Sequence, residues 1–460
     1  MTKIFIWVGL FASSVGFADI KHFAWEQLQF RQSRTWGPTL PAYTLKQKTN
    51  HSDPTDTQTF SQRYFFDAKH AKDKNSPVLF YLCGESTCDP RSLDGSIRNH
   101  ARKHQAYIVA LEHRYYGKSQ PFKDLSTPNL KYLTTDQAMA DAVAFREHVV
   151  KSAKLTGKWI LVGGSYAGIL SSRLRSTHPA LFAGALASSA PVRAEELFEQ
   201  YDHHLFKVVS ASCSKAVQKV VDEVEKRLAD PVKNKEVKRL FRAEKLTQDV
   251  DFLYWVADIA AFAIQYGYQD AFCTALDHSD PVAGYASYAP EIERIFEIDA
   301  VKDSPQGAVS ENPADYEKGF GMRGWAYQTC NEYGYWQIAY HDRAESMRSA
   351  RIDLPHHRRV CERLFGIKTP AQTDATNKRS VEPLHLSTTT RIFFTNGAKD
   401  PWIGLSLAVE NRNTTNAALQ YATIADAAHC DDLRAPTIDD NASLRDARSR
   451  FSNLISDWLK

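Results

Sequence analysis

The sequence lacks the motifs of several large enzyme classes. It contains no Walker-type glycine loop, no dinucleotide-binding fingerprint and no HExxH metal motif. Its formal net charge of +3 is small for 460 residues, which argues against a nucleic-acid-binding surface. Beyond the first residues, no apolar run is long enough to span a membrane. We therefore expect no metal, no cofactor, no nucleic acid and no membrane partner for the mature chain.

Residues 1–18 have the features of a secretory signal. Lys3 supplies the positive start, residues 4–12 are apolar, and Gly16 and Ala18 are small residues before a cleavage site near Asp19. A buried N-terminal strand is the alternative interpretation. We expect a secreted or periplasmic protein, or one in a lysosome- or vacuole-like compartment of a eukaryote.

Export would place the seven cysteines in an oxidising compartment, where disulfides can form. An odd number leaves at least one thiol unpaired or paired between chains, and some cysteines can simply be small buried hydrophobes. The cysteines are Cys83, Cys88, Cys213, Cys273, Cys330, Cys361 and Cys430.

Predicted strands and helices alternate in the first part of the chain, which is typical of a parallel α/β sheet. From about residue 195 to 370 the pattern is helical and charged, and strand character returns at 390–397 before a last helix at 441–460. We expect a sheet domain formed by residues 19–192 and 386–460, interrupted by a mainly helical cap, residues 193–385. The predicted strands are 62–67, 77–83, 106–113, 158–164 and 182–190, and the predicted helices are 134–150 and 167–178.

Ser165 lies in "GGSYAG", between a predicted strand and a predicted helix. In the nucleophile elbow of α/β-hydrolases a serine occupies such a corner, with small residues two positions before and after it. Here these residues are Gly163 and Ala167, where the usual pattern has a second glycine. An ordinary strand-to-helix loop is the alternative.

An acid and a base follow the serine in the chain order of α/β-hydrolases. Asp400 comes directly after the strand 390–397, and His429 lies before the last helix. A neutral imidazole would take the proton of Ser165, and Asp400 would orient the ring. The other histidines precede Asp400, many of them in the helical segment. The sequence therefore predicts an α/β-hydrolase fold with Ser165, Asp400 and His429 as its triad.

Two backbone N–H groups are candidates for an oxyanion hole. One belongs to Tyr166, the residue after the nucleophile, and the other to Gly84 in "YLCGESTC". A disulfide between Cys83 and Cys88 would close this loop into a ring; a reduced pair of thiols is the alternative. Glu85 can hold the loop, meet a substrate amine or pair with an arginine.

Several motifs together resemble a family of serine peptidases, the one that contains prolyl carboxypeptidase and dipeptidyl peptidase II. Within it, the chain is similar to the thymus-specific serine protease branch. The motifs cover most of the chain in the family's order: "FSQRYFFD", "LFYLCGESTC", "ALEHRYYGKSQPF", "GGSYAGILSSRLRSTHPALFAGALASSAPV", "YQTCNEYGYWQ", "FTNGAKDPW" and "AHCDDLR".

This resemblance implies an α/β-hydrolase fold and cleavage after proline or another small residue, with the same triad. It also implies disulfides between Cys213 and Cys273 and between Cys330 and Cys361. The branch often has a cysteine after "DLR", which this chain lacks, so Cys430 is the expected odd thiol.

Aromatic residues in "GWAYQTCNEYGYWQ" are candidates for substrate binding, because flat rings suit a proline ring. They are Trp325, Tyr333 and Trp336, with Trp402 beside the predicted acid loop. Glu332 could receive a substrate's amino terminus. The alternative is that the aromatics are core residues and that Glu332 is a structural hydrogen-bond partner.

These observations predict a secreted serine peptidase that acts on peptides through an acyl-enzyme. A carboxylesterase or lipase on the same fold is the first alternative, against which the absence of an "HGGG" motif argues. The second is a non-catalytic binding protein, which would be expected to lose a triad member. A homodimer, and amino-terminal, carboxy-terminal or internal cleavage, stay open.

Overall fold

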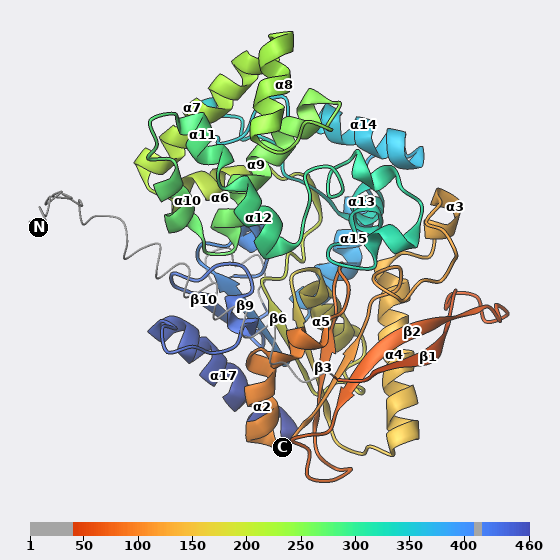
Figure 1. Cartoon of the computed structure of the whole chain (residues 1–460). Coiled ribbons are helices and arrows are strands. Elements are labelled where there is room, and N and C mark those ends of the chain that lie inside the picture. Colours follow the sequence, from red (N-terminus) through yellow and green to blue (C-terminus); the bar gives the residue numbers. More distant parts are fainter. Residues whose placement is uncertain (1–39, 409–415) are drawn as a thin grey trace, which may run out of the picture. The chain divides into compact units, whose positions relative to one another are not determined.

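An eight-stranded sheet forms the centre of the computed structural model, which describes residues 40–408 and 416–460 (Figure 1). The strand order is β1-β2-β4-β3-β5-β6-β9-β10; β2 is antiparallel to both of its neighbours, and all other pairs are parallel. This is an α/β-hydrolase sheet, so the predicted fold class is confirmed. The strands are β1 Ala42–Lys48, β2 Thr59–Asp67, β3 Val78–Leu82, β4 Tyr107–Leu111, β5 Trp159–Gly164, β6 Gly184–Ser188, β9 Ile392–Gly397 and β10 Gln420–Ile424.

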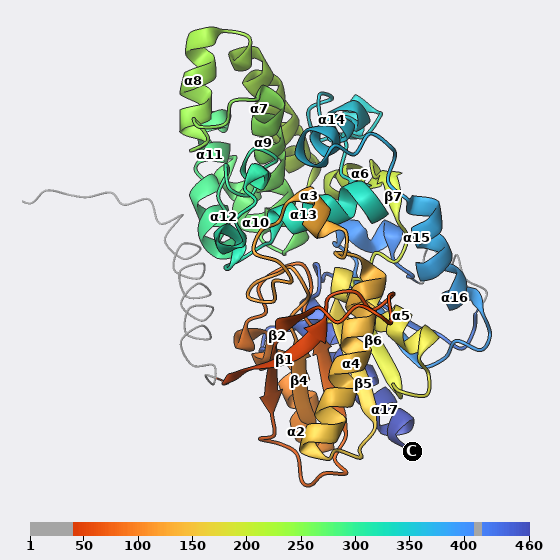
Figure 2. The ribbon, with the colours of Figure 1, turned by 90° about the vertical axis from the view of Figure 1, so that its right-hand side faces the viewer.

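Helices cover both faces of this sheet, which explains why its central strands are continuous apolar runs. Alternate residues of β3 enter different cores: Phe80 packs with helices α4 and α5, and Leu79 packs with α2 and α17. Figures 1 and 2 show α4 and α17 on opposite sides of the sheet. These helices, with the short α3, are α2 Ser96–His104, α3 Thr127–Leu130, α4 Thr135–Ala153, α5 Tyr166–Thr177 and α17 Ala442–Leu459.

A long insertion separates β6 from β9 in the chain. In both views its helices lie above the sheet (Figures 1 and 2). It also contains a parallel strand pair, β7 Glu195–Leu197 with β8 Gly334–Trp336. Its helices are α6 Gln200–Val208, α7 Ala211–Leu228, α8 Pro231–Leu240, α9 Asp249–Gln265, α10 Gln269–Ala275, α11 Pro281–Ala286, α12 Ala289–Phe296, α13 Met322–Gln328, α14 Leu354–Phe365, α15 Thr373–Ser380 and α16 Glu382–His385.

Short helical turns complete the described part of the chain. One of them, Thr329–Tyr333 (η4), is a π-helical turn. The 3₁₀ turns are η1 Pro90–Asp94, η2 Gly307–Val309, η3 Pro313–Tyr316, η5 Arg343–Glu345, η6 Pro401–Leu405 and η7 Asp431–Leu433.

Three disulfides link the cysteines. Cys213–Cys273 joins α7 to α10, Cys330–Cys361 joins η4 to α14, and Cys83–Cys88 closes the loop after β3. Cys430 is a free, half-buried thiol. The two pairings implied by the resemblance are confirmed, as is the odd thiol.

The predicted signal, residues 1–18, lies outside the described residues. Within the described residues, no helix combines the length and the apolar character that a membrane crossing requires.

Candidate active site

Ser165 lies in the turn between β5 and α5, in a backbone conformation that is rare for a residue with a side chain. Its φ is 55° and its ψ is −130°. Such strain persists only where the surroundings enforce it, and it concentrates at functional sites. A Cβ on Gly163 would lie 2.1 Å from the backbone oxygen of Ala167, so the turn needs glycine at that position. The side chain of Ala167 is buried and fits, so the departure from the usual pattern leaves the turn intact.

Asp400 and His429 form a hydrogen-bonded pair in the loops after β9 and β10. His429 Nδ1 donates to Asp400 Oδ2 at 2.9 Å, and the side chains are 4% and 0% exposed respectively. Burial by itself lowers the pKa of His429, but the charge of Asp400 and contacts with Cys430 raise that pKa well above its ordinary value. In the neutral form of the ring, Nδ1 carries the proton that faces Asp400, and Nε2 is then left to accept a proton.

The turn of Ser165 and the loop of His429 meet at the end of β6. The backbone N–H of Ser165 donates to the last β6 residue at 2.9 Å, and that of Cys430 donates to the hydroxyl of the next residue, Ser189, at 2.9 Å. A Cβ on Gly164 would lie 3.0 Å from Cys430 Sγ. The neighbours of Ser165 and His429 in the chain are therefore packed together.

The two predicted oxyanion donors lie near the start of α5. Tyr166 is the first residue of this helix, so its N–H has no partner within the helix. A Cβ on Gly84 would lie 3.8 Å from the backbone nitrogen and the Cβ of Ala167. The loop closed by Cys83–Cys88 therefore runs beside the first turn of α5.

Glu112, in the motif "EHRYYGKS", binds the backbone of the loop that Cys83–Cys88 closes. Its fully buried carboxylate pairs with Arg63 and accepts hydrogen bonds from the backbone N of Cys88 at 3.1 Å and from Ser119 Oγ at 2.7 Å. A Cβ on Gly117 would lie 2.1 Å from Glu112 Oε1, which explains the glycine. The sequence did not predict this structural role of Glu112, because the motif served only to indicate the family resemblance. The available signal was a single glutamate directly after an apolar strand.

Glu85 lies near His429. Burial raises the pKa of the Glu85 carboxyl, and the charge of His429 opposes that rise. Its backbone oxygen accepts a hydrogen bond from Gly321 N in the insertion at 3.1 Å. The arginine partner considered from the sequence is not seen: within residues 40–408 and 416–460, no cation forms an ion pair with this carboxylate.

Aromatic side chains gather between the nucleophile turn and the acid loop. The ring of Trp402 lies 5.4 Å from that of Tyr335, which in turn lies 5.0 Å from Tyr333 and 6.3 Å from Trp325. Trp325 also contacts Tyr166 edge-to-face at 5.8 Å. The structure thus brings Trp325, Tyr333 and Trp402 together, with Trp325 keeping some exposed surface.

The structure does not bring Trp336 to this group. Its ring stacks on His357 at 5.6 Å, within a separate core cluster. Tyr335 and Trp336 are consecutive in β8, and successive strand residues point to opposite faces.

The carboxylate of Glu332 lies against the N-terminus of α4, where it accepts hydrogen bonds from Thr135. Oε2 accepts hydrogen bonds from the backbone N of Thr135 at 3.1 Å and from its hydroxyl at 3.0 Å. Burial raises the pKa of Glu332 to about 7, and these hydrogen bonds oppose that rise. These contacts give Glu332 a structural partner within the chain.

The phenol of Tyr166 belongs to the same buried group. Tyr166 OH accepts a hydrogen bond from Gln328 Nε2 at 2.9 Å and donates to His113 Nε2 at 3.0 Å. His113 Nδ1 donates to a backbone oxygen, and burial lowers the pKa of His113 to about 4, so the ring is neutral. Sequence reasoning missed Thr135 and Gln328, which no motif spacing distinguishes from other buried polar residues.

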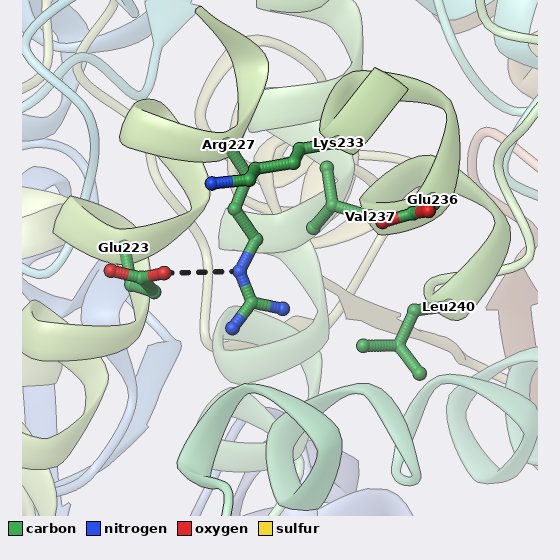
Figure 3. A pocket seen from close by; sticks show the side chains of 6 residues that line it. All are labelled: Glu223, Arg227, Lys233, Glu236, Val237 and Leu240. Carbon is green, nitrogen blue, oxygen red and sulfur yellow. Dashed lines mark hydrogen bonds and ion pairs between the residues drawn. The ribbon is translucent and has the colours of Figure 1, made fainter. Parts of the chain in front are cut away.

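A cavity of about 450 Å³ lies in the insertion, between α7 and α8 (Figure 3). Its lining is of mixed charge and includes an ion pair between Glu223 and Arg227. None of its lining residues is a predicted site residue. They are Glu223, Arg227, Lys233, Glu236, Val237 and Leu240. In the described part of the chain, no group of three or more His, Cys, Asp and Glu side chains is arranged to hold a metal ion.

Similar proteins were found both by sequence and by structure. A probable serine protease of Arabidopsis thaliana, EDA2, is 34% identical over 86% of this chain and 83% of its own length. The thymus-specific serine protease of Mus musculus is 28% identical over 90% of this chain and 87% of its own length. A solved proline iminopeptidase of Mycobacterium smegmatis covers 91% of this chain and 99% of its own, at a TM-score of 0.42 and 10% identity.

The plant relative shares more identity than the mouse protein, so the resemblance holds for the family and not for the thymus-specific branch alone. The model of the family described as serine carboxypeptidase S28 matches residues 47–451. This match covers both the sheet and the insertion, and it includes Ser165, Asp400 and His429. The chain belongs to the serine carboxypeptidase S28 family of serine peptidases.

Proposed function

We propose that this serine peptidase cleaves peptide bonds through an acyl-enzyme on Ser165, with His429 as base and Asp400 as its orienting acid. The observation that carries the proposal is the 2.9 Å contact between His429 and Asp400, in loops beside the strained turn of Ser165. A strained serine turn alone is compatible with an inert corner. A buried imidazole–carboxylate pair in the adjoining loop supports a nucleophile.

The reaction would follow from these positions. As the Ser165 hydroxyl bonds to the peptide carbon, His429 Nε2 takes its proton and then gives it to the leaving amine. Asp400 stays ionised and stabilises the imidazolium. The N–H groups of Tyr166 and Gly84 would donate to the oxygen that becomes negative. Water then attacks the acyl-enzyme by the reverse proton path and frees Ser165.

A preference for proline or another small residue before the cleaved bond is supported by the flat rings of Trp325, Tyr335 and Trp402 near the acid loop. Export is supported by the signal-like residues 1–18 and by three disulfides. A protein of Arthroderma benhamiae that is 27% identical to this chain is named a probable extracellular serine carboxypeptidase.

Replacing the nucleophile tests the proposal. We expect Ser165→Ala to reduce hydrolysis of proline-containing peptides by up to about 10⁶-fold without changing the melting temperature. A fluorophosphonate probe should label wild type on the peptide that contains Ser165 and should not label the variant. Ser152→Ala, at an exposed serine of α4, is the matched control and should behave as wild type.

Peptide turnover that persists in Ser165→Ala, or labelling at another serine, would contradict the mechanism. Efficient turnover of simple esters together with no turnover of peptides would instead favour the esterase alternative.

A further inference from the structure

Helix α9 ends directly against the loop of His429. Gln265 is the last residue of this helix, and the last carbonyl groups of a helix have no partner within it. The backbone N–H of His429 donates to the backbone oxygen of Gln265 at 2.9 Å. The insertion therefore fixes the backbone of the predicted base.

The side chain of the same residue reaches the loop of the predicted acid. Gln265 Oε1 accepts hydrogen bonds from the indole N–H of Trp402 at 3.0 Å and from the hydroxyl of Tyr201 at 2.7 Å. The backbone N–H of Trp402 donates to Asp400 Oδ1 at 3.0 Å. The side chain of Gln265 is thus linked to Asp400 through a single intervening residue, Trp402.

The residue after Gln265 contacts the imidazole itself. The ring of Tyr266 meets that of His429 edge-to-face, with centroids 5.8 Å apart. The backbone oxygen of Tyr266 accepts a hydrogen bond from Arg434, in the chain just after η7, at 3.0 Å. The end of α9 therefore holds the loop of His429 from two sides.

We propose that Gln265, a residue of the insertion, is a positioning residue that keeps Asp400 and His429 at hydrogen-bonding distance from each other. This proposal rests on the proposed function of the pair. The acid and the base come from separate loops, and their 2.9 Å contact depends on supports common to both loops, of which the pairing of β9 with β10 is the first. A second support is needed where the loops extend beyond the paired strands. Gln265 supplies one, since its backbone oxygen binds one loop and its side-chain oxygen binds the other. The negative end of the α9 dipole also favours the imidazolium that forms during the reaction.

The test removes the side-chain contacts and keeps the volume. We expect Gln265→Met to lower kcat by about 10- to 100-fold while KM changes less than about threefold, because misplacement of catalytic groups by a fraction of an ångström costs rate. The kcat–pH profile should shift as well, since the Asp400 contact sets the protonation of His429. Gln269→Met is the matched control: this glutamine is also buried, in the next helix, and among the described residues no hydrogen bond joins its side chain to either loop.

A double-mutant cycle with Trp402→Phe separates positioning from general destabilisation. If Gln265 acts through the indole N–H, the two substitutions together should lower kcat little more than either alone. Fully additive losses, or an unchanged kcat and pH profile in a folded Gln265→Met, would overturn the proposal. If Gln265→Met does not fold, Trp402→Phe alone decides, and an unchanged kcat in that variant overturns the proposal.

Wild type and Ser165→Ala, measured in parallel, keep the two hypotheses apart. A wild-type protein that neither hydrolyses peptides nor reacts with a fluorophosphonate at Ser165 would reject the proposed function. If the wild type is active and Gln265→Met has an unchanged kcat and pH profile, only the positioning role is rejected.

Discussion

Glu85 is a half-buried carboxylate whose pKa responds to the charge of His429, and it forms no ion pair with any cation of the described chain. Burial raises its pKa, so its charge is costly in the free protein and would be stabilised by a cation brought by the substrate. The α-amino group of a peptide is such a cation. At the scale of the residue, Glu85 is thus a candidate for choosing which end of a peptide enters.

Replacing this charge should separate two kinds of peptide. We expect Glu85→Gln to raise KM for peptides with a free amino terminus by about 10-fold or more, because a hydrogen bond to a charged group contributes roughly 1.5–3 kcal/mol. The same peptides with an acetylated amino terminus should show no such change. An equal effect on both would assign Glu85 to holding its loop.

Residues of the site differ in how far the sequence could predict them. Ser165, Asp400 and His429 stand in loops next to apolar strands and in a known chain order, so pattern alone identified them as candidates. Gln265 and Thr135 act through contacts between segments far apart in the chain, and neither belongs to a motif. Trp336 was grouped with its neighbours because the sequence did not show that β8 would turn alternate rings to opposite faces.

At the scale of elements, the apolar strands were predictable and the polar edge strand was not. β3, β5 and β9 are buried along nearly their whole length, and their runs were recognised. β1, "AYTLKQK", lies at the sheet edge and is mostly exposed at its start, so no strand was expected there. The boundaries 193 and 385 of the helical cap stay predictions.

We expect the disulfide in the loop after β3 to serve the candidate site more than stability. Cys83–Cys88 spans only 5 positions, whereas Cys330–Cys361 spans 31, and a longer loop loses more entropy on closure. We expect the double variant Cys83→Ser/Cys88→Ser to lower kcat by about 10-fold or more by loosening the Gly84 donor, with a small change in melting temperature.

Cys330→Ser/Cys361→Ser is the matched control for this loop. It should cost about 2–4 kcal/mol of unfolding free energy and leave kcat nearly unchanged in the folded protein. Calorimetry together with steady-state kinetics distinguishes the two double variants, and the reverse pattern would remove the special role of the loop.

At the scale of the whole molecule, Glu332 joins the insertion to the sheet. Its side chain binds Thr135 at the start of α4, and its backbone oxygen accepts a hydrogen bond from Thr376 in α15 at 2.8 Å. Because Glu332 is only 5% exposed, its ionisation is costly in the folded state. The contribution of this contact, between the insertion and α4, to the free energy of unfolding should therefore depend on pH.

The sign of that dependence follows from the pKa of Glu332, which burial raises to about 7 in the folded chain. Its contribution to stability is fully present below its ordinary pKa of 4.5 and is lost as pH rises to 7, since only the unfolded chain gives up the proton freely over that range. We expect wild type to lose up to about 3 kcal/mol relative to Glu332→Gln between these pH values.

Urea unfolding of both proteins at several pH values measures this difference. Glu317→Gln, at an exposed glutamate of the insertion, is the control and should follow wild type throughout. Parallel curves for wild type and Glu332→Gln would show that this carboxyl does not titrate in the expected way.

The chain order of the proposed triad has a consequence for biosynthesis. Ser165 precedes the insertion, whereas Asp400 and His429 follow it. A ribosome therefore synthesises Ser165 before the residue that would accept its proton. In the proposed mechanism, a polypeptide still being translated, or broken off before its last segment, has no base for the Ser165 hydroxyl and would not attack the proteins around it.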